Sequence, residues 1–380
     1  MTDFFYFDYN LSIIKIIFNK KNAYGYQLLY NFDKSNGGHT NNIAAMESFD
    51  IYHATFSNSL VATCSWDNTV KIWDMTSGLL KYTFDSTNGG HDYWVTELAV
   101  FENGDLASYT YTTLKIWDIR NGRLKFTFNI TYSDDKEWFN SMHVLRDGSL
   151  ATSTYGGYIK IWDLKVGKLK IKLNHLNGTS NERVPTLFQL KDGTLASGCV
   201  NGDIKIWDLE SYQLKYTISK AHSSTPSMFL QLEDGRVVSG SLDSSIKIWD
   251  PENWELRYTF DRLNGGHTKL IRCIILLDNG FMASGSEDFL IKIWDVVNMK
   301  LKYTLQGHSA HILSLVKLDN GNLISGSYDG SIKLWDPMNG KLIETVYQAE
   351  PKIYVREVIK MDNGNLVASL SSNEIKVWRE

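Results

Sequence analysis

The sequence predicts an all-β fold assembled from eight copies of one four-stranded antiparallel unit. Three observations lead to this fold class: a tetrapeptide that recurs at nearly constant spacing, turn-forming pairs between short apolar runs, and the composition. Aromatic residues make up 13% of the 380 residues and there are only five prolines, a balance that favours β-structure over disorder.

The recurring tetrapeptide is Lys-Ile-Trp-Asp or a close variant of it, and it accounts for eight of the 12 tryptophans. Its copies begin at Lys71, Lys115, Lys160, Lys205, Lys247, Lys292, Lys333 and Lys376. A period of about 43 residues with four strands in each period is typical of a β-propeller blade. The chain is therefore predicted to be an eight-bladed β-propeller, with seven blades plus a spare unit as the alternative.

Four apolar runs of strand length make up each unit. In one unit they are residues 271–277, 281–286, 290–295 and 301–305. An Asn-Gly or Asp-Gly pair, which tolerates the backbone angles of a tight hairpin, separates the first two runs in seven of the eight units. The first unit has a longer connection at 49–59 instead.

The last unit ends at residues 375–380, directly after its third strand, and so lacks a fourth. Residues 26–40 align with 78–92, a fourth strand and the loop after it, so an N-terminal strand is predicted to close the ring. Residues 26–380 then form one propeller domain. Residues 1–25 are an N-terminal extension that includes a possible half-blade remnant, and we expect residues 375–379 to take the third-strand position for which that remnant competes.

With these repeats the sequence resembles the WD-repeat family over about residues 26–380. In that family a His before the unit, a Ser or Thr of the second strand, an Asp of the next turn and the Trp of the third strand form a hydrogen-bonded tetrad. The resemblance implies complete tetrads in four units: His39, Asp67 and Trp73; His222, Asp243 and Trp249; His267, Asp288 and Trp294; and His308, Asp329 and Trp335. The hydroxyls available to them are those of Thr63, Ser239, Ser284 and Ser325.

The other four units depart from the tetrad pattern, and we expect their blades to be locally softer because a charge-assisted hydrogen bond is lost. The second unit keeps His91 and Trp117 but has Thr112 near the Asp position. The third, fourth and eighth units have Asp135, Ser180 and Pro351 in place of His, and Gly156, Asn201 and Ser372 in place of Asp.

The resemblance also implies which residues lie on the face that binds partners. We call the residue just before the turn Asp the turn position, and the residue three after the His the loop position. Turn positions in unit order are Trp66, Tyr111, Tyr155, Val200, Leu242, Glu287, Tyr328 and Ser371. Loop positions are Asn42, Trp94, Trp138, Arg183, Thr225, Leu270, His311 and Tyr354.

Aromatic residues at these positions gather in blades 7, 8, 1, 2 and 3, and Trp and Tyr are the residues that dominate interface hot spots. The predicted partner-binding residues are Trp66, Trp94, Tyr111, Trp138, Tyr155, His311, Tyr328 and Tyr354. Arg272 and Arg356, five residues after the His position, are predicted to read an acidic group near the channel mouth. The prediction is a non-catalytic scaffold that binds a protein or peptide, as a monomer or as a subunit of a complex.

Two other functions stay open. The chain can be an architectural subunit that docks through its bottom face or rim, or the substrate-recognition subunit of a ubiquitin ligase, as some WD-repeat proteins are. Enzymatic activity, cofactors and metal ions are not expected, because no nucleophile motif, phosphate loop or metal-ligand spacing occurs. The Gly-Gly-His runs at 37–39, 89–91 and 265–267 lack the Lys-Ser/Thr of a phosphate loop.

Charge and hydropathy limit the expected partners and the expected location of the protein. A net charge of −4 argues against a nucleic-acid partner, and no apolar run approaches the ~20 residues of a membrane helix. The first residues lack the positive charge of a secretory leader, and three widely spaced cysteines do not suggest a disulfide framework. We therefore expect a cytoplasmic protein, with the nucleus as a second possible location.

Overall fold

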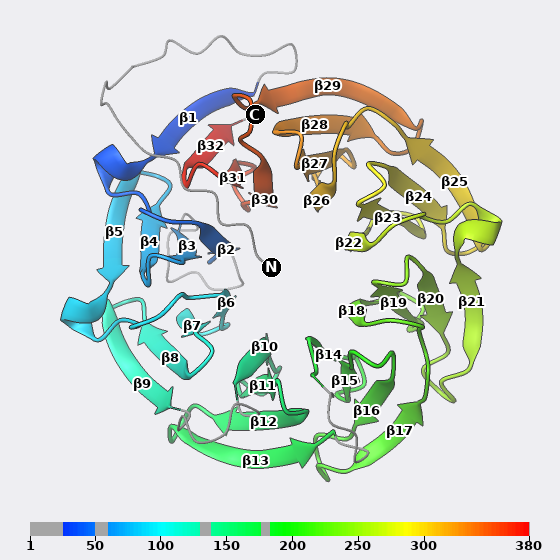
Figure 1. Cartoon of the computed structure of the whole chain (residues 1–380), viewed down its shortest axis with the longest axis horizontal. Coiled ribbons are helices and arrows are strands. Elements are labelled where there is room, and N and C mark those ends of the chain that lie inside the picture. The colour runs from blue at the N-terminus through cyan, green and yellow to red at the C-terminus, as the bar shows by residue number, and fades with distance from the viewer. Residues whose placement is uncertain (1–25, 50–59, 130–137, 176–182, 380) are drawn as a thin grey trace, which may run out of the picture.

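The computed structural model describes residues 26–49, 60–129, 138–175 and 183–379, which form a closed ring of eight four-stranded antiparallel blades (Figure 1). This confirms the eight-bladed propeller predicted from the repeat. The extension 1–25, with its half-blade remnant, and most of the connection at 49–59 lie outside the described residues. Within the described part of the chain, no helix has the length and apolar character needed to cross a membrane.

Each blade runs along the chain from its innermost to its outermost strand, except that the outermost strand of blade 8 comes from the N-terminus. Blades 1 and 2 consist of β2 (Ile43–Ser48), β3 (Leu60–Ser65), β4 (Val70–Asp74) and β5 (Leu79–Phe84), then β6 (Glu97–Val100), β7 (Asp105–Tyr109), β8 (Thr113–Asp118) and β9 (Arg123–Asn129). Blades 3 and 4 consist of β10 (Phe139–Val144), β11 (Leu150–Thr154), β12 (Tyr158–Asp163) and β13 (Lys168–Asn174), then β14 (Thr186–Gln189), β15 (Leu195–Gly198), β16 (Ile204–Trp207) and β17 (Leu214–Ile218).

The second half of the ring follows the same order. Blades 5 and 6 consist of β18 (Pro226–Gln231), β19 (Val237–Ser241), β20 (Ile246–Trp249) and β21 (Leu256–Phe260), then β22 (Ile271–Leu276), β23 (Phe281–Ser286), β24 (Ile291–Asp295) and β25 (Lys300–Leu305). Blades 7 and 8 consist of β26 (Ile312–Lys317), β27 (Leu323–Ser327), β28 (Ser331–Asp336) and β29 (Lys341–Gln348), then β30 (Val355–Lys360), β31 (Leu366–Leu370), β32 (Ile375–Arg379) and β1 (Gln27–Phe32). Between first and second strands, the glycine of each predicted turn pair has a φ of 74° to 93°, as a tight hairpin requires.

The ring closes where β1 pairs antiparallel with β32, in a register that runs from Gln27 opposite Arg379 to Phe32 opposite Ile375. This confirms the predicted closure by an N-terminal strand. Figure 1 shows β1, drawn in blue, as the outermost strand beside the red strands of blade 8. Because β1 completes blade 8, the edge of β32 is covered and cannot pair with a strand of another chain.

The core lies between blades, where the Trp of a third strand packs against an aromatic ring from the outermost strand of the preceding blade. Phe32 lies 4.5 Å from Trp73, measured between ring centroids, and Phe84 lies 4.2 Å from Trp117. All four rings are at most 2% exposed. Burial of large apolar rings is the main favourable term in folding, so these contacts hold each blade to the next.

Candidate functional site

The four complete tetrads share one geometry. In blade 1, Nδ1 of His39 lies 3.0 Å from Asp67 Oδ2, and Nε2 lies 2.8 Å from Thr63 Oγ1. Trp73 Nε1 donates to the same hydroxyl at 2.8 Å. An indole N–H can only donate and a carboxylate can only accept, so the hydroxyl donates to Nε2 and Nδ1–H donates to the carboxylate.

The same chain of hydrogen bonds recurs in blades 5, 6 and 7. The His–carboxylate distances are 3.0 Å for His222 and Asp243, 2.9 Å for His267 and Asp288, and 2.9 Å for His308 and Asp329. The indoles of Trp249, Trp294 and Trp335 each donate to the tetrad serine of their blade, at 2.8 Å. Every polar group of the tetrads thus has a structural partner.

Burial sets the charge state of these groups. It lowers the pKa of His39, although the hydrogen bond to Asp67 opposes the shift, so the ring is neutral near pH 7. Burial also favours the neutral form of Asp67, but hydrogen bonds from His39 and Thr69 outweigh it and hold the pKa of that carboxyl well below its usual range. A neutral imidazole beside a fixed carboxylate at four separate places in a ring serves the fold and does not form one catalytic centre.

Two blades depart from the tetrad in ways that the sequence did not predict. In blade 2 the hydroxyl that bonds His91 Nδ1 belongs to Thr113, the neighbour of Thr112, at 2.8 Å. In blade 4 the ring that packs near Trp207, with centroids 6.0 Å apart, is that of His175. Ser180, which the repeat alignment placed at the His position, lies outside the described residues. Neither ring nitrogen of His175 has a hydrogen-bond partner among the residues that the structure describes.

The turn and loop positions meet on one face of the ring, which we call the top face. In seven blades the N–H at the turn position donates to the carbonyl at the loop position of the same blade. The pairs, at 2.9 to 3.1 Å, are Trp66 and Asn42, Tyr155 and Trp138, Val200 and Arg183, Leu242 and Thr225, Glu287 and Leu270, Tyr328 and His311, and Ser371 and Tyr354. Because this bond recurs, the two positions read from the repeat are structurally equivalent from blade to blade.

Side chains at these positions pair across blade boundaries. Trp66 of blade 1 stacks on Trp94 of blade 2 with ring centroids 4.9 Å apart. At the boundary between blades 2 and 3 the ring centroids of Tyr111 and Trp138 are 6.0 Å apart. The guanidinium carbon of Arg183 lies over the ring of Tyr155, 4.9 Å from its centroid. The same rings that cap the boundaries also face solvent, since Trp94 is 43% and Tyr111 40% exposed.

Blade 2 breaks the backbone pattern, and a pocket lies there. No bond joins Tyr111 N–H to the Trp94 carbonyl among the described residues. A hollow of about 160 Å³ opens beside them and is lined by Tyr93, Tyr111, Thr112 and Trp138. Tyr93, which is 55% exposed, is missing from the sequence prediction because it lies one residue before the loop position. The pocket extends the aromatic surface of blades 1 to 3.

The two predicted arginines differ in their surroundings. Arg272 donates through Nε to the carboxylate of Glu287 at 2.8 Å and forms an ion pair with it. Arg356 lies over the ring of Tyr354 at 5.1 Å, and its Nε has no acceptor among the described residues. Of the two, only Arg356 has no carboxylate partner among the described residues, and since its Nε is buried, its terminal N–H groups are the ones left for a ligand.

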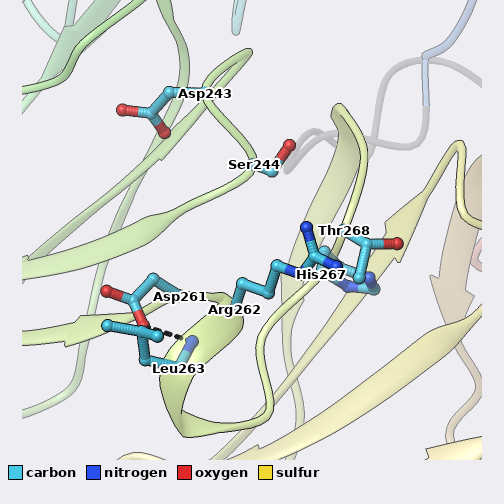
Figure 2. A pocket seen from close by; sticks show the side chains of 7 residues that line it. All are labelled: Asp243, Ser244, Asp261, Arg262, Leu263, His267 and Thr268. Atoms are coloured by element: carbon cyan, nitrogen blue, oxygen red, sulfur yellow. Dashed lines mark hydrogen bonds between the residues drawn. The ribbon is translucent and has the colours of Figure 1, made fainter.

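A second hollow, of about 270 Å³, lies near the boundary of blades 5 and 6 (Figure 2). Its acidic groups serve the fold: Asp243 belongs to a tetrad, and Asp261 caps the short 3₁₀ helix η4 (Arg262–Asn264) by accepting from Leu263 N–H at 2.9 Å. The same Asp-capped turn precedes β2 as η1 (Lys34–Asn36) and β6 as η2 (Ser86–Asn88). Among the described residues no group of three His, Cys, Asp or Glu side chains is placed to hold a metal ion.

Comparison with known families matches the chain to the model described as "WD domain, G-beta repeat" at residues 30–74, 216–250, 254–295 and 299–336. Each of these four segments contains one complete His–Asp–Trp tetrad. Among solved structures, the computationally designed Ika8 protein is 26% identical, with a TM-score of 0.75, over 93% of this chain and 100% of that chain. The WD40 β-propeller domain of Doa1 is 21% identical, with a TM-score of 0.58, over 94% of this chain and 97% of that domain. No curated protein matches the chain.

The ring, its tetrads and the matched repeats together define a class of protein, the β-propellers built from tryptophan–aspartate repeats. The resemblance to the WD-repeat family is confirmed at four repeats, and the chain is an eight-bladed β-propeller that contains WD repeats. Propellers of this family generally serve as scaffolds for protein interactions.

Proposed function

We propose that this propeller is a non-catalytic platform that binds a protein or peptide partner on its top face, along an arc over blades 7, 8, 1, 2 and 3. The observation that carries the proposal is the pairing of partly exposed aromatic rings across three blade boundaries on that face, those between blades 7 and 8, 1 and 2, and 2 and 3. Trp66 with Trp94, Tyr111 with Trp138 and Tyr328 with Tyr354 are three such pairs.

Ring pairs of this kind suit a binding surface for two physical reasons. Each ring is held by its neighbour across the boundary, so little side-chain entropy remains to be lost when a partner binds. One ring of each pair is also open to solvent: Trp94, Tyr111 and Tyr328 are 40% to 51% exposed. Large, rigid and partly exposed aromatic side chains supply most of the binding energy in typical interfaces.

The test is capture of partners by the immobilised chain, wild type beside the double variant Trp94→Ala/Trp138→Ala. We expect the double variant to lose the captured proteins while its melting temperature stays close to that of the wild type. Each substitution removes a ring pair that contributes about 0.5–1.5 kcal/mol beyond burial, which a propeller of this size tolerates.

A matched control replaces two exposed apolar side chains on outermost strands, in Leu79→Ala/Leu256→Ala. Leu79 is 66% and Leu256 48% exposed, and neither lies at a turn or loop position. We expect this variant to capture partners like the wild type. If capture survives loss of the two tryptophans but not loss of the two leucines, the platform is the rim and the proposal is wrong.

A further inference from the structure

Four rings form a continuous ladder over blades 6, 7 and 8 on the top face. They are Phe289, His311, Tyr328 and Tyr354. Successive ring centroids are 5.6, 5.8 and 4.1 Å apart, with interplanar angles of 26°, 40° and 16°. We call this set the ring ladder. Tyr328, in its centre, is 51% exposed, so the ladder has an open apolar face.

A cation lies on each end of the ring ladder. Lys269 Nζ is 5.2 Å from the centroid of Phe289, and the Arg356 guanidinium is 5.1 Å from that of Tyr354. Ring faces attract cations through their negative potential, which fixes where these two charges sit. Both ends of the ladder are therefore positive.

Carboxylates near the ring ladder already have partners. Asp288 and Asp329 bond the tetrad histidines, and Glu287 is paired with Arg272. Neither Lys269 nor Arg356 forms an ion pair within the described part of the chain, and the buried Nε of Arg356 has no acceptor there. An unpaired, partly buried guanidinium is costly, and a carboxylate that accepts from it removes this cost.

We infer that the ring ladder and Arg356 bind an acidic peptide segment of the partner protein. An Asp or Glu carboxylate of the segment pairs with the Arg356 guanidinium, and an adjacent apolar or aromatic side chain lies on Tyr328. The inference rests on the proposed function, since it assigns a ligand chemistry to one part of the same arc. A peptide fits better than a nucleic acid, because two cations across three blades leave most phosphates of a strand unpaired.

The inference is tested by panning a random 12-residue phage-displayed peptide library on the full chain. Enriched peptides are then made as fluorescein conjugates, and their affinity is measured by fluorescence polarisation. We expect the enriched sequences to place Asp or Glu beside an apolar or aromatic residue. Arg356→Gln and Tyr328→Ala should each weaken binding at least about 10-fold, as loss of a hydrogen bond to a charged group does.

The charge-matched control is Arg262→Gln. Arg262 is exposed in η4, near the boundary of blades 5 and 6 (Figure 2). Its replacement by Gln changes the net charge as much as Arg356→Gln does, but alters no residue of the ring ladder. It should weaken binding less than about 3-fold, which is the scale of an exposed charge. Equal losses in Arg356→Gln and Arg262→Gln overturn the inference, as does tighter binding of a fluorescent 20-nucleotide oligo-dT than of any enriched peptide.

The same experiment separates this inference from the proposed function. If the enriched peptides lack acidic residues and their binding is lost in Trp94→Ala/Trp138→Ala, the platform stands and the acidic ligand is wrong. If no enriched peptide loses affinity in any top-face variant, both are wrong. Melting curves of Arg356→Gln and Tyr328→Ala, read by circular dichroism, must match the wild type for the affinities to count.

Discussion

The carboxylate of Glu357 in blade 8 accepts a hydrogen bond from the backbone N–H of Met46 in blade 1, with the two atoms 3.0 Å apart. This bond joins the innermost strands of the last and first blades, β30 and β2, beside the boundary that closes the ring. Glu97, on the innermost strand of blade 2, accepts from the hydroxyl of Tyr109 in the same blade at 2.8 Å. The Glu357 carboxyl thus ties blade 8 to blade 1, and Glu47 and Glu97 are further carboxyl groups of innermost strands.

These carboxyl groups predict a dependence of stability on pH. Burial raises the pKa of Glu47 to about 8, with help from the nearby charges of Glu357 and Glu97, and raises the pKa of each of those two to about 7. The folded chain therefore holds these protons more tightly than the unfolded chain does. The contribution of these three groups to the free energy of unfolding should fall as the pH rises from about 4.5 towards 8, and level off above that.

The measurement is the melting temperature of wild type and Glu47→Gln between pH 6.5 and 8.5. Histidines of the unfolded chain titrate near pH 6.5, whereas burial lowers the pKa of the folded tetrad histidines, so they add a slope of opposite sign at the lower end of this range. That slope is the same in both chains, so the difference between wild type and Glu47→Gln reports on Glu47. Because the cavity of about 570 Å³ beside Glu47 and Glu357 admits solvent, we expect Glu47→Gln to gain only about 1–2 kcal/mol at pH 8. The exposed Glu350→Gln serves as control and should keep the wild-type slope.

The repeat predicted the ring, its closure and the paired top-face positions because each depends on short-range features that recur in every unit. The Trp that packs against the preceding blade, the Gly that permits the hairpin and the turn between second and third strands all lie within one period. Counting from the His position therefore located Trp94 and Tyr354, and counting from the turn Asp located Tyr328, without knowledge of any contact. Even where the His is absent, as in blade 8, the spacing holds, since Ser371 N–H donates to the Tyr354 carbonyl.

Other features depend on contacts between units, and the repeat alone does not encode them. His175 was missed because it directly follows β13, before the segment 176–182, whereas a fixed count back from Arg183 reaches Ser180. Glu47, Glu97 and Glu357 come from three blades and become one group only when the ring closes. Phe289 lies one residue after its turn Asp, and its place in the ring ladder depends on His311 of the next blade.

A complete tetrad should contribute measurably to stability. Asp288→Ala removes the acceptor of His267 Nδ1 and of two backbone N–H groups, those of Thr268 and Leu290. We expect it to lower the free energy of unfolding by about 2–3 kcal/mol, since buried donors lose a charged acceptor. Chemical denaturation measures the change. Asp319→Ala, which removes an 80% exposed carboxylate paired with Lys360, should stay within about 0.5 kcal/mol. A similar loss in both variants contradicts a special role for the tetrad.

His175 and His222 should respond oppositely to replacement by Phe. Both rings are buried, but Nδ1 and Nε2 of His222 bond Asp243 and Ser239, whereas those of His175 have no partner among the described residues. His222→Phe leaves two polar groups unpaired and should cost about 1–3 kcal/mol. His175→Phe removes two unpaired nitrogens next to Trp207 and should be neutral or stabilising by up to about 1 kcal/mol. Thermal unfolding at pH 7.5, where both rings are neutral, measures the difference; destabilisation by His175→Phe would show that this ring has a partner.

The closing strand should be the weakest point of the ring, and Phe32 tests this. Its ring is 2% exposed and packs on Trp73 from β1, a strand held to β32 by pairing between distant parts of the chain. Phe84 makes the equivalent contact with Trp117 from β5, which is joined to its blade by a short turn. Both Phe32→Ala and Phe84→Ala should cost about 3–5 kcal/mol through the cavity they leave.

The two variants should differ in where the ring opens. No turn joins β1 to β32, so only strand pairing and side-chain packing hold the two strands together. Phe32→Ala should therefore lose amide hydrogen-exchange protection throughout 27–32 and 375–379. In Phe84→Ala the turn between β4 and β5 limits opening, so protection should fall only locally and the closing pair should keep wild-type exchange. Hydrogen exchange read by mass spectrometry on peptides from both regions makes the comparison. Equal loss of protection at β1 and β32 in the two variants would show that the ring opens as one cooperative unit.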